Sequence, residues 1–126
     1  MNILVIDDNL FDHELVEEQI ECHIPNSIIE KAYNGVEGLK VLEKLYLDKQ
    51  LPSLIITDLN MPLMDGLEIY TTIKNDNRFK NIPVVIFTTS SFSKARFAEQ
   101  NILIFVKPFD IIEFAKVLVD ILDHAA

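Results

Sequence analysis

Short apolar runs recur along the chain, and each has the length of one β-strand. Five of them are rich in β-branched residues and lie at 3–6, 27–29, 54–57, 84–87 and 102–106. These runs lack the strict alternation of a half-buried strand, which is typical of strands covered on both faces in a parallel sheet. The run at 27–29 is cut short by Glu30 and Lys31.

Helical patterns separate the apolar runs. Residues with helical spacing predict three helices, whose apolar faces carry Phe11, Leu15, Ile20 and Ile24, then Leu39, Leu42 and Tyr46, then Ile69, Tyr70 and Ile73. Residues 91–99 have a weaker helical pattern, and 111–122 have a strong one. Alternating strands and helices imply right-handed crossovers. We therefore expect an α/β fold, a doubly wound five-stranded parallel sheet with five flanking helices.

Polar residues follow four of the five apolar runs. They are Asp7 and Asp8 after the first run, Asp58 after the third, Thr88 and Thr89 after the fourth, and Lys107 with Pro108 after the fifth. In a parallel sheet these ends share one edge, so three carboxylates, a hydroxyl and an ammonium should converge there. Carboxylates in one place repel each other, and a hard cation such as Mg²⁺ compensates for this. Such a set suits phosphoryl transfer with an aspartate as the nucleophile.

Together these residues resemble the receiver domain of two-component response regulators. The resemblance covers the whole chain, and the motifs that carry it are Asp7-Asp8, Asp58-Leu59-Asn60-Met61-Pro62, Asp65-Gly66, Thr88 and Lys107-Pro108. Each motif alone has a simpler interpretation, since Asp7-Asp8 could cap a helix and Asp65-Gly66 could form a turn. Their joint order along the chain favours the family.

The resemblance implies a flavodoxin-like sheet in the order 2-1-3-4-5 and a role for each matching residue. Asp58 would accept phosphate from the phosphohistidine of a sensor histidine kinase or a phosphotransfer protein. Asp8, supported by Asp7, would hold Mg²⁺ together with Asp58 and the backbone carbonyl of Asn60. Lys107 would pair with a phosphate oxygen, and the Thr88 hydroxyl would move to the phosphoryl group. Gly66 and Pro108 would be structural, with a cis bond between Lys107 and Pro108.

A narrower resemblance, over 73–90, is to the small stand-alone receivers that work with bacterial phytochrome-type kinases. The chain also departs from the family. Ile104 stands where receivers usually have an aromatic switch residue, and the adjacent Phe105 should point to the opposite face of the sheet. Gln100-Asn101 replaces a common Gly-Ala pair, and the short spacing from Thr88 to Lys107 predicts a reduced fourth helix.

Composition narrows the class of protein. The length of 126 residues predicts one domain, and together with the resemblance this implies a single receiver domain, 1–126, without an output domain. A net charge of −9 argues against nucleic-acid and membrane-surface partners. No apolar run approaches the roughly 20 residues that cross a bilayer, and the N-terminus lacks a signal-peptide pattern. The single cysteine, Cys22, excludes an internal disulfide and fits a cytoplasmic location. The histidines lack metal-ligand spacing, so His13, His23 and His124 are expected on solvated helix surfaces.

The function expected from these observations is a phospho-accepting switch that signals by protein contacts and is no enzyme beyond its own phosphorylation and dephosphorylation. A phosphorylation-independent interaction module is the main alternative. A hydrolase of the haloacid dehalogenase type lacks its D-x-D motif here, and a flavin-binding protein would place phosphate against an acidic loop.

The last helical segment also suggests a partner. Its apolar residues span more of the helix circumference than packing on a sheet requires. Exposed apolar surface usually marks an interface. We therefore expect a homodimer through this helix and the fifth strand, with Val117 and Ile121 in the contact.

Overall fold

The structure, a computed structural model, describes residues 1–90 and 102–125. Its sheet contains β1 (Asn2–Ile6), β2 (Ile28–Ala32), β3 (Leu54–Thr57), β4 (Val84–Thr88) and β5 (Leu103–Val106). The strands are parallel and lie in the order β2-β1-β3-β4-β5. The predicted flavodoxin-like sheet is confirmed.

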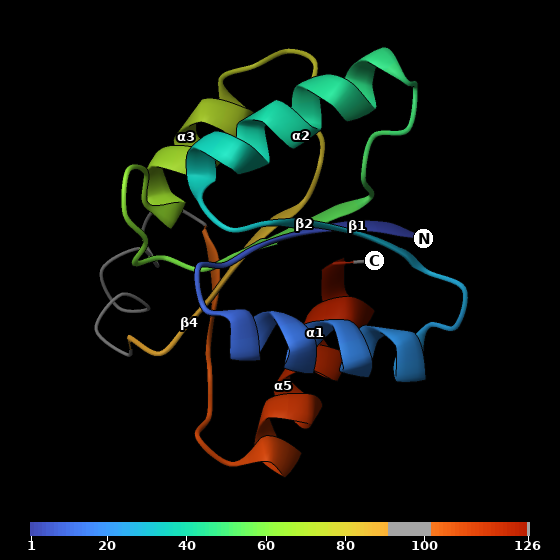
Figure 1. The fold of residues 1–126 in the computed structure, drawn as a ribbon, viewed down its shortest axis with the longest axis vertical. Coiled ribbons are helices and arrows are strands. Elements are labelled where there is room, and N and C mark those ends of the chain that lie inside the picture. Colours follow the sequence, from blue (N-terminus) through green and yellow to red (C-terminus); the bar gives the residue numbers. More distant parts are fainter. Residues whose placement is uncertain (91–101, 126) are drawn as a thin grey trace.

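Helices cover both faces of this sheet (Figure 1). Helices α1 (Leu10–His23) and α5 (Ile111–Ala125) lie on one face, and α2 (Gly35–Leu47) and α3 (Gly66–Lys74) lie on the other. The described residues thus hold four helices where five were predicted, because the expected helix at 91–99 and the Gln100-Asn101 pair fall outside them. None of these four helices is long and apolar enough to cross a membrane.

The continuous apolar runs are explained by burial on both faces. Ile3 and Val5 of β1 belong to the core under α1 and α5, whereas Leu4 and Ile6 belong to the core under α2 and α3. Successive side chains of a strand point to opposite faces, so a central strand between two helical layers is apolar throughout. This packing holds the carboxyl ends of the strands at one fixed edge.

Strand β2 extends beyond its predicted run and includes Glu30 and Lys31. It pairs only with β1 and is therefore an edge strand. Lys31 forms an ion pair with Glu17 of α1, at 2.5 Å. An edge strand tolerates charged side chains that a central strand would exclude, which is why the apolar run underestimated its length.

Helix α1 buries most of its predicted apolar face, since Ile20 is in the core and Leu15 and Ile24 pack against it, but Phe11 does not follow. The buried residues of α1 are His13, Val16 and Ile20, while Phe11 is 61% exposed. The surface position expected for His13 is wrong, since its Nε2 lies 2.9 Å from the Ala32 carbonyl oxygen. His23 and His124 are exposed, as expected. A buried polar ring needs a hydrogen-bond partner, and the carbonyl at the end of β2 supplies one.

The predicted interface residues of α5 need correction. Ile121 is fully buried and cannot lie in a contact between copies, whereas Val117 is partly buried and packs against the core under α1 and α5. Phe114, Leu118, Ile121 and Leu122 face the sheet, which turns Ile111 and Ile112 outward. The helix does carry surplus apolar surface, but on the side next to α1.

Candidate functional site

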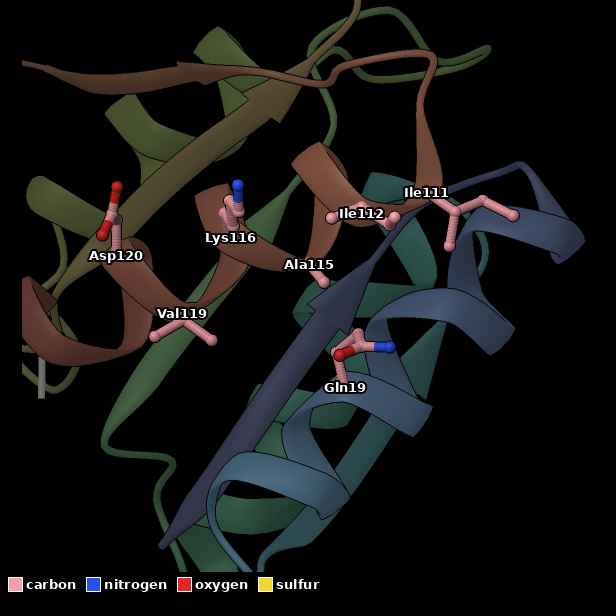
Figure 2. Close-up of a pocket in the computed structure, with 7 residues that line it drawn as sticks. All are labelled: Gln19, Ile111, Ile112, Ala115, Lys116, Val119 and Asp120. Atoms are coloured by element: carbon pink, nitrogen blue, oxygen red, sulfur yellow. The ribbon is translucent and has the colours of Figure 1, made fainter.

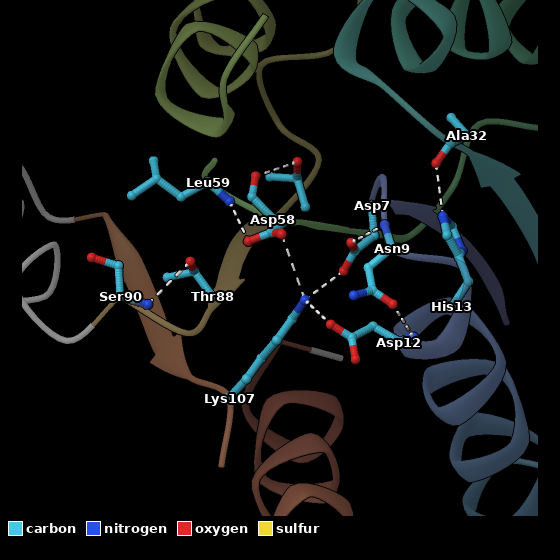
Figure 3. A network of polar contacts seen from close by, with 11 residues as sticks. Asp7, Asn9, Asp12, His13, Ala32, Asp58, Leu59, Thr88, Ser90 and Lys107 are labelled. Atoms are coloured by element: carbon cyan, nitrogen blue, oxygen red, sulfur yellow. Dashed lines mark hydrogen bonds and ion pairs between the residues drawn. The ribbon is translucent and has the colours of Figure 1, made fainter. Parts of the chain in front are cut away.

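Four strands bring the polar residues together at one edge of the sheet (Figure 3). Ile6 of β1 is in register with Thr57 of β3, so the next residues, Asp7 and Asp58, emerge side by side. Thr88 is in register with Val106, and Lys107 follows directly. The register of the strands therefore explains why these polar side chains meet at one edge of the sheet, as the sequence predicted.

Three carboxylates form a possible cation site. One oxygen from each of Asp7, Asp8 and Asp58 lies within 4.8 Å of the others. Asp7 is buried, Asp58 is partly buried and Asp8 is exposed, so the cluster opens to solvent on one side. Hard oxygen ligands around such an opening suit Mg²⁺, which keeps several waters. The residues present thus fit a divalent cation.

Asp58 lies in an electrostatically mixed environment. Burial raises the pKa of its carboxyl group, the nearby Lys107 ammonium lowers that pKa, and the Asp7 carboxylate raises it, with a net upward shift. Smaller lowering effects on the pKa come from the Leu59 N–H, which donates to Asp58 Oδ1 at 2.8 Å, and from the Thr88 hydroxyl. The site therefore disfavours negative charge at Asp58, and any further negative group bound there needs positive charge nearby.

Lys107 supplies one such charge and contacts three carboxylates. Its Nζ lies 2.6 Å from Asp7 Oδ2, 2.8 Å from Asp12 Oδ2 and 3.6 Å from Asp58 Oδ2. Burial lowers the pKa of this ammonium, but Asp7 and then Asp58 raise it by more, with a net upward shift. Lys107 is thus held as a cation in a nearly inaccessible position, 3% exposed.

Sequence reasoning missed Asp12. This residue lies in the first turn of α1, where an acid is common because it interacts favourably with the helix dipole. Its backbone N–H donates to the side chain of the N-cap residue Asn9, at 3.1 Å. The available signal was its spacing, one helical turn after Asp8, which brings its side chain back towards the strand ends.

Gly66 fixes the loop that follows Asp58. Its N–H donates to the Leu59 carbonyl at 2.8 Å, and the capping box of Asp65 and Glu68 starts α3 at this point. A β-carbon on Gly66 would overlap the Asp58 carbonyl oxygen and lie 2.9 Å from the Leu59 α-carbon. Glycine is therefore required by the close approach of α3 to the strand end.

Ile104 and Phe105 of β5 point to opposite faces of the sheet, as the sequence indicated. Ile104 is buried with Leu59, Ile86 and Ile102, whereas Phe105 packs against the core under α1 and α5. The expected alternation along β5 is confirmed, and Ile104, at the position where the resemblance implies an aromatic residue, is aliphatic. Thr88 is fully buried at the end of β4, and its hydroxyl accepts a hydrogen bond from the Ser90 N–H at 3.4 Å.

Pro108 follows Lys107, and both line a pocket together with Phe109 and Phe114. The described chain has no cis peptide bond, so the cis bond implied for Lys107 and Pro108 is wrong.

The family model described as the response regulator receiver domain matches residues 3–118. The chain belongs to this family. Receiver domains are signalling switches of two-component systems rather than classical enzymes. The predicted recognition is therefore confirmed.

Relatives of known sequence include stand-alone and composite proteins. The receiver domain is 33% identical over 90 residues to the response regulator Rcp1 of Synechocystis sp., covering 70% of this chain and 61% of that protein. It is 35% identical to the chemotaxis protein CheY1 of Helicobacter pylori, covering 71% and 68%. The match to the sensor histidine kinase CheAY of Helicobacter pylori is 33% identical and covers 69% of this chain but only 10% of that protein.

Solved structures agree with the fold and the narrower resemblance. The phosphorylated cyanobacterial phytochrome response regulator RcpA superposes with a TM-score of 0.85 at 25% identity, covering 97% of this chain and 91% of that one. The Mn²⁺-bound form of Rcp1 has a TM-score of 0.84 at 26% identity, covering 98% and 92%. The receiver domain is thus similar to phytochrome-associated stand-alone receivers.

Proposed function

We propose that this receiver domain is a phospho-accepting switch, with Asp58 as the acceptor. The observation that carries the proposal is the position of the Asp58 carboxylate. It belongs to the three-carboxylate cluster and also faces the buried Lys107 ammonium, 3.6 Å from its Oδ2. An acceptor in this position has positive charge available for both the attacking and the transferred oxygens.

The proposed donor is the phosphohistidine of a sensor histidine kinase or a phosphotransfer protein. An Asp58 carboxylate oxygen attacks the phosphorus, the new P–O bond forms as the P–N bond breaks, and the bonding electron pair returns to the histidine nitrogen. Lys107 then pairs with a phosphoryl oxygen, and the Thr88 hydroxyl moves towards the same group. Support comes from RcpA, whose solved structure is of its phosphorylated form, and from CheAY, a matching relative that is named as a sensor histidine kinase.

The proposed cofactor is Mg²⁺, held by Asp7, Asp8, Asp58 and the backbone carbonyl of Asn60. When bound, the cation neutralises charge on the transferring phosphoryl group. The solved Mn²⁺-bound form of Rcp1 supports this assignment. The receiver would assist only its own phosphorylation and dephosphorylation, in a cytoplasmic location.

Phosphorylation by acetyl phosphate in the presence of Mg²⁺ tests this proposal. Intact-mass spectrometry should show one added phosphate, which hydroxylamine removes because an acyl phosphate is sensitive to this nucleophile. The Asp58→Asn variant, which retains the shape of the side chain, should remain unmodified. A wild-type protein that gains no phosphate, from either acetyl phosphate or a histidine kinase, would instead be a phosphorylation-independent interaction module.

We also propose a second copy of the chain as a partner, at a corrected surface. A groove of about 640 Å³ lies between α1 and α5 (Figure 2). Ile111, Ile112, Ala115 and Val119 line it with apolar surface, and Lys116 and Asp120 lie along its edge. Lys116 and Asp120 are one turn apart on α5, so a two-fold axis would place each beside its opposite charge on the other copy. That self-complementarity favours a copy of this chain.

A further inference from the structure

The fourth carboxylate, Asp12, has a clear structural partner and no assigned role. The three-carboxylate cluster consists of Asp7, Asp8 and Asp58, and Asp12 is outside it. Asp12 Oδ2 instead lies 2.8 Å from Lys107 Nζ, whereas Asp58 Oδ2 lies 3.6 Å from the same nitrogen. Figure 3 shows Lys107 pointing between these carboxylates. The described state therefore has Lys107 bound to Asp12 and Asp7 in preference to the acceptor.

The ammonium has a limited number of donors. Lysine offers three N–H groups, and two of them are used by Asp7 and Asp12, at 2.6 and 2.8 Å. Both ion pairs are shielded, because the side chain of Lys107 is 3% exposed and that of Asp12 is 19% exposed. Shielded, hydrogen-bonded ion pairs are stronger than exposed ones. The third N–H remains for a group on Asp58, but the two shorter contacts hold the ammonium on the side of Asp7 and Asp12.

Asp12 is also held in place by its own helix. The Asn9 side chain caps α1 through the Asp12 N–H, and Asn9 donates its own N–H to Asp7 Oδ1 at 2.9 Å. The first turn of α1 is thus tied to the strand end that carries the cluster. The backbone that carries the Asp12 carboxylate is therefore fixed relative to Asp7, on the side of Lys107 away from Asp58.

We propose that Asp12 is a positioning residue that holds Lys107 back from Asp58 and so disfavours the phosphorylated state. The inference rests on the proposed phosphorylation of Asp58. A phosphoryl group adds negative charge at Asp58 and draws Lys107 towards it, so the contact with Asp12 is lost or lengthened. Asp12 also places a like charge near the new group. Both effects shift the balance of the switch towards the unphosphorylated form.

A simpler role for Asp12 is to stabilise α1. An acid in the first turn contributes about 0.3–1 kcal/mol through the helix dipole. That role affects the melting temperature but is the same in the phosphorylated and unphosphorylated states. Binding of a phosphoryl mimic therefore separates the two roles, since only a contact that changes between the states alters its affinity.

The experiment measures the affinity of beryllium fluoride in the presence of Mg²⁺. This probe forms a tetrahedral group on a carboxylate oxygen, with the shape of a phosphoryl group. Asp12→Asn removes the charge and keeps the shape of the side chain, and we expect it to bind beryllium fluoride about three- to tenfold more tightly than the wild type. The matched control is Glu14→Gln, an exposed acid of α1 with the same change in net charge, which should bind as the wild type does.

Equal or weaker affinity in Asp12→Asn would overturn the inference. A wild type that does not bind beryllium fluoride at Asp58 would instead reject the proposed function, and the inference with it. A second measurement needs no variant: the carboxyl-carbon resonance of Asp12 in wild-type protein should shift when beryllium fluoride binds, because the carboxylate loses its ammonium partner. An Asp12 resonance that stays in place as Lys107 signals move would also overturn the inference.

Discussion

Gly66 approaches the Asp58 carbonyl so closely that a β-carbon on Gly66 would overlap it. This contact joins the start of α3 to the residue that we propose as the phosphoryl acceptor. We expect Gly66→Ala to lower the free energy of unfolding by about 1–3 kcal/mol, since the obstructing atoms are backbone. Thermal unfolding measures this loss. A variant as stable as the wild type and phosphorylated at the same rate would contradict the structural role of Gly66.

Replacing Asp58 should stabilise the fold at neutral pH. Its pKa is raised above the ordinary value of 3.8 mainly by burial, so the folded state binds a proton more tightly than the unfolded state does. Stability therefore falls as the pH rises from about 3.8 through the raised pKa, and the ionised group destabilises the fold above it. In buffer without Mg²⁺, we expect Asp58→Asn to melt at a higher temperature than the wild type at pH 7, and thermal unfolding measures the difference.

The same comparison at lower pH provides the control. Below the ordinary pKa, Asp58 is protonated in both states, and the advantage of Asp58→Asn should disappear. Asp48, an exposed residue at the end of α2, offers a matched Asp48→Asn variant whose melting temperature should follow the wild type. An advantage of Asp58→Asn that is independent of pH would show that charge is not its cause.

Mg²⁺ should raise the melting temperature of the wild type, because a ligand that binds only the folded state stabilises it by mass action. At about ten times the dissociation constant the gain is about 1.4 kcal/mol. Asp8→Ala removes a ligand that is exposed at the edge of the cluster and should lose most of this gain, whereas Asp48→Asn should retain it. An equal response of Asp8→Ala and the wild type would reject the metal assignment.

Lys107→Ala should fold but with lower stability and an altered switch. Removing the ammonium leaves Asp7, Asp12 and Asp58 without their shared cation, and breaking a buried ion pair costs about 3 kcal/mol or more. Mg²⁺ should restore part of this loss by supplying positive charge. In NMR spectra the variant should show little of the shift response that phosphorylation produces in the wild type. A full response would contradict the proposed role of Lys107.

If two copies associate through the α1–α5 groove, a charged side chain placed in that groove should prevent the association. Val119→Glu places a carboxylate among the apolar groove residues and should yield a folded monomer by light scattering. The matched control is Leu47→Glu, since Leu47 is 77% exposed at the end of α2 and away from α5. A wild type that is monomeric at high concentration, or a Val119→Glu variant with unchanged mass, would reject the dimer.

Much of the fold could be predicted because central strands and strand ends leave a local pattern. The runs that contain Ile3 to Ile6 and Leu54 to Thr57 are apolar for burial on both faces, and their register brings Asp7 beside Asp58. Strand β2 was harder, because an edge strand with Glu30 and Lys31 has no continuous apolar run.

Other features depend on tertiary contacts that no local pattern encodes. The buried His13 ring has a hydrogen-bond partner in the carbonyl oxygen at the end of β2. Ile121 is buried because the rotation of α5 about its axis turns this residue towards the sheet. Asp12 resembles an ordinary acid in a first helical turn, and only the folded chain places it on Lys107. The cluster of Asp7, Asp8 and Asp58 was predictable, but the partners of Lys107 were not.

The position of the phosphoryl group tests the central claim most directly. Protein treated with acetyl phosphate and Mg²⁺ can be reduced with borohydride, which converts an aspartyl phosphate to homoserine and marks the residue permanently. Peptide mass spectrometry should then find homoserine at position 58 alone, with no mark in the Asp58→Asn variant. Homoserine at another position, or the same yield of phosphate in Asp58→Asn, would contradict the account.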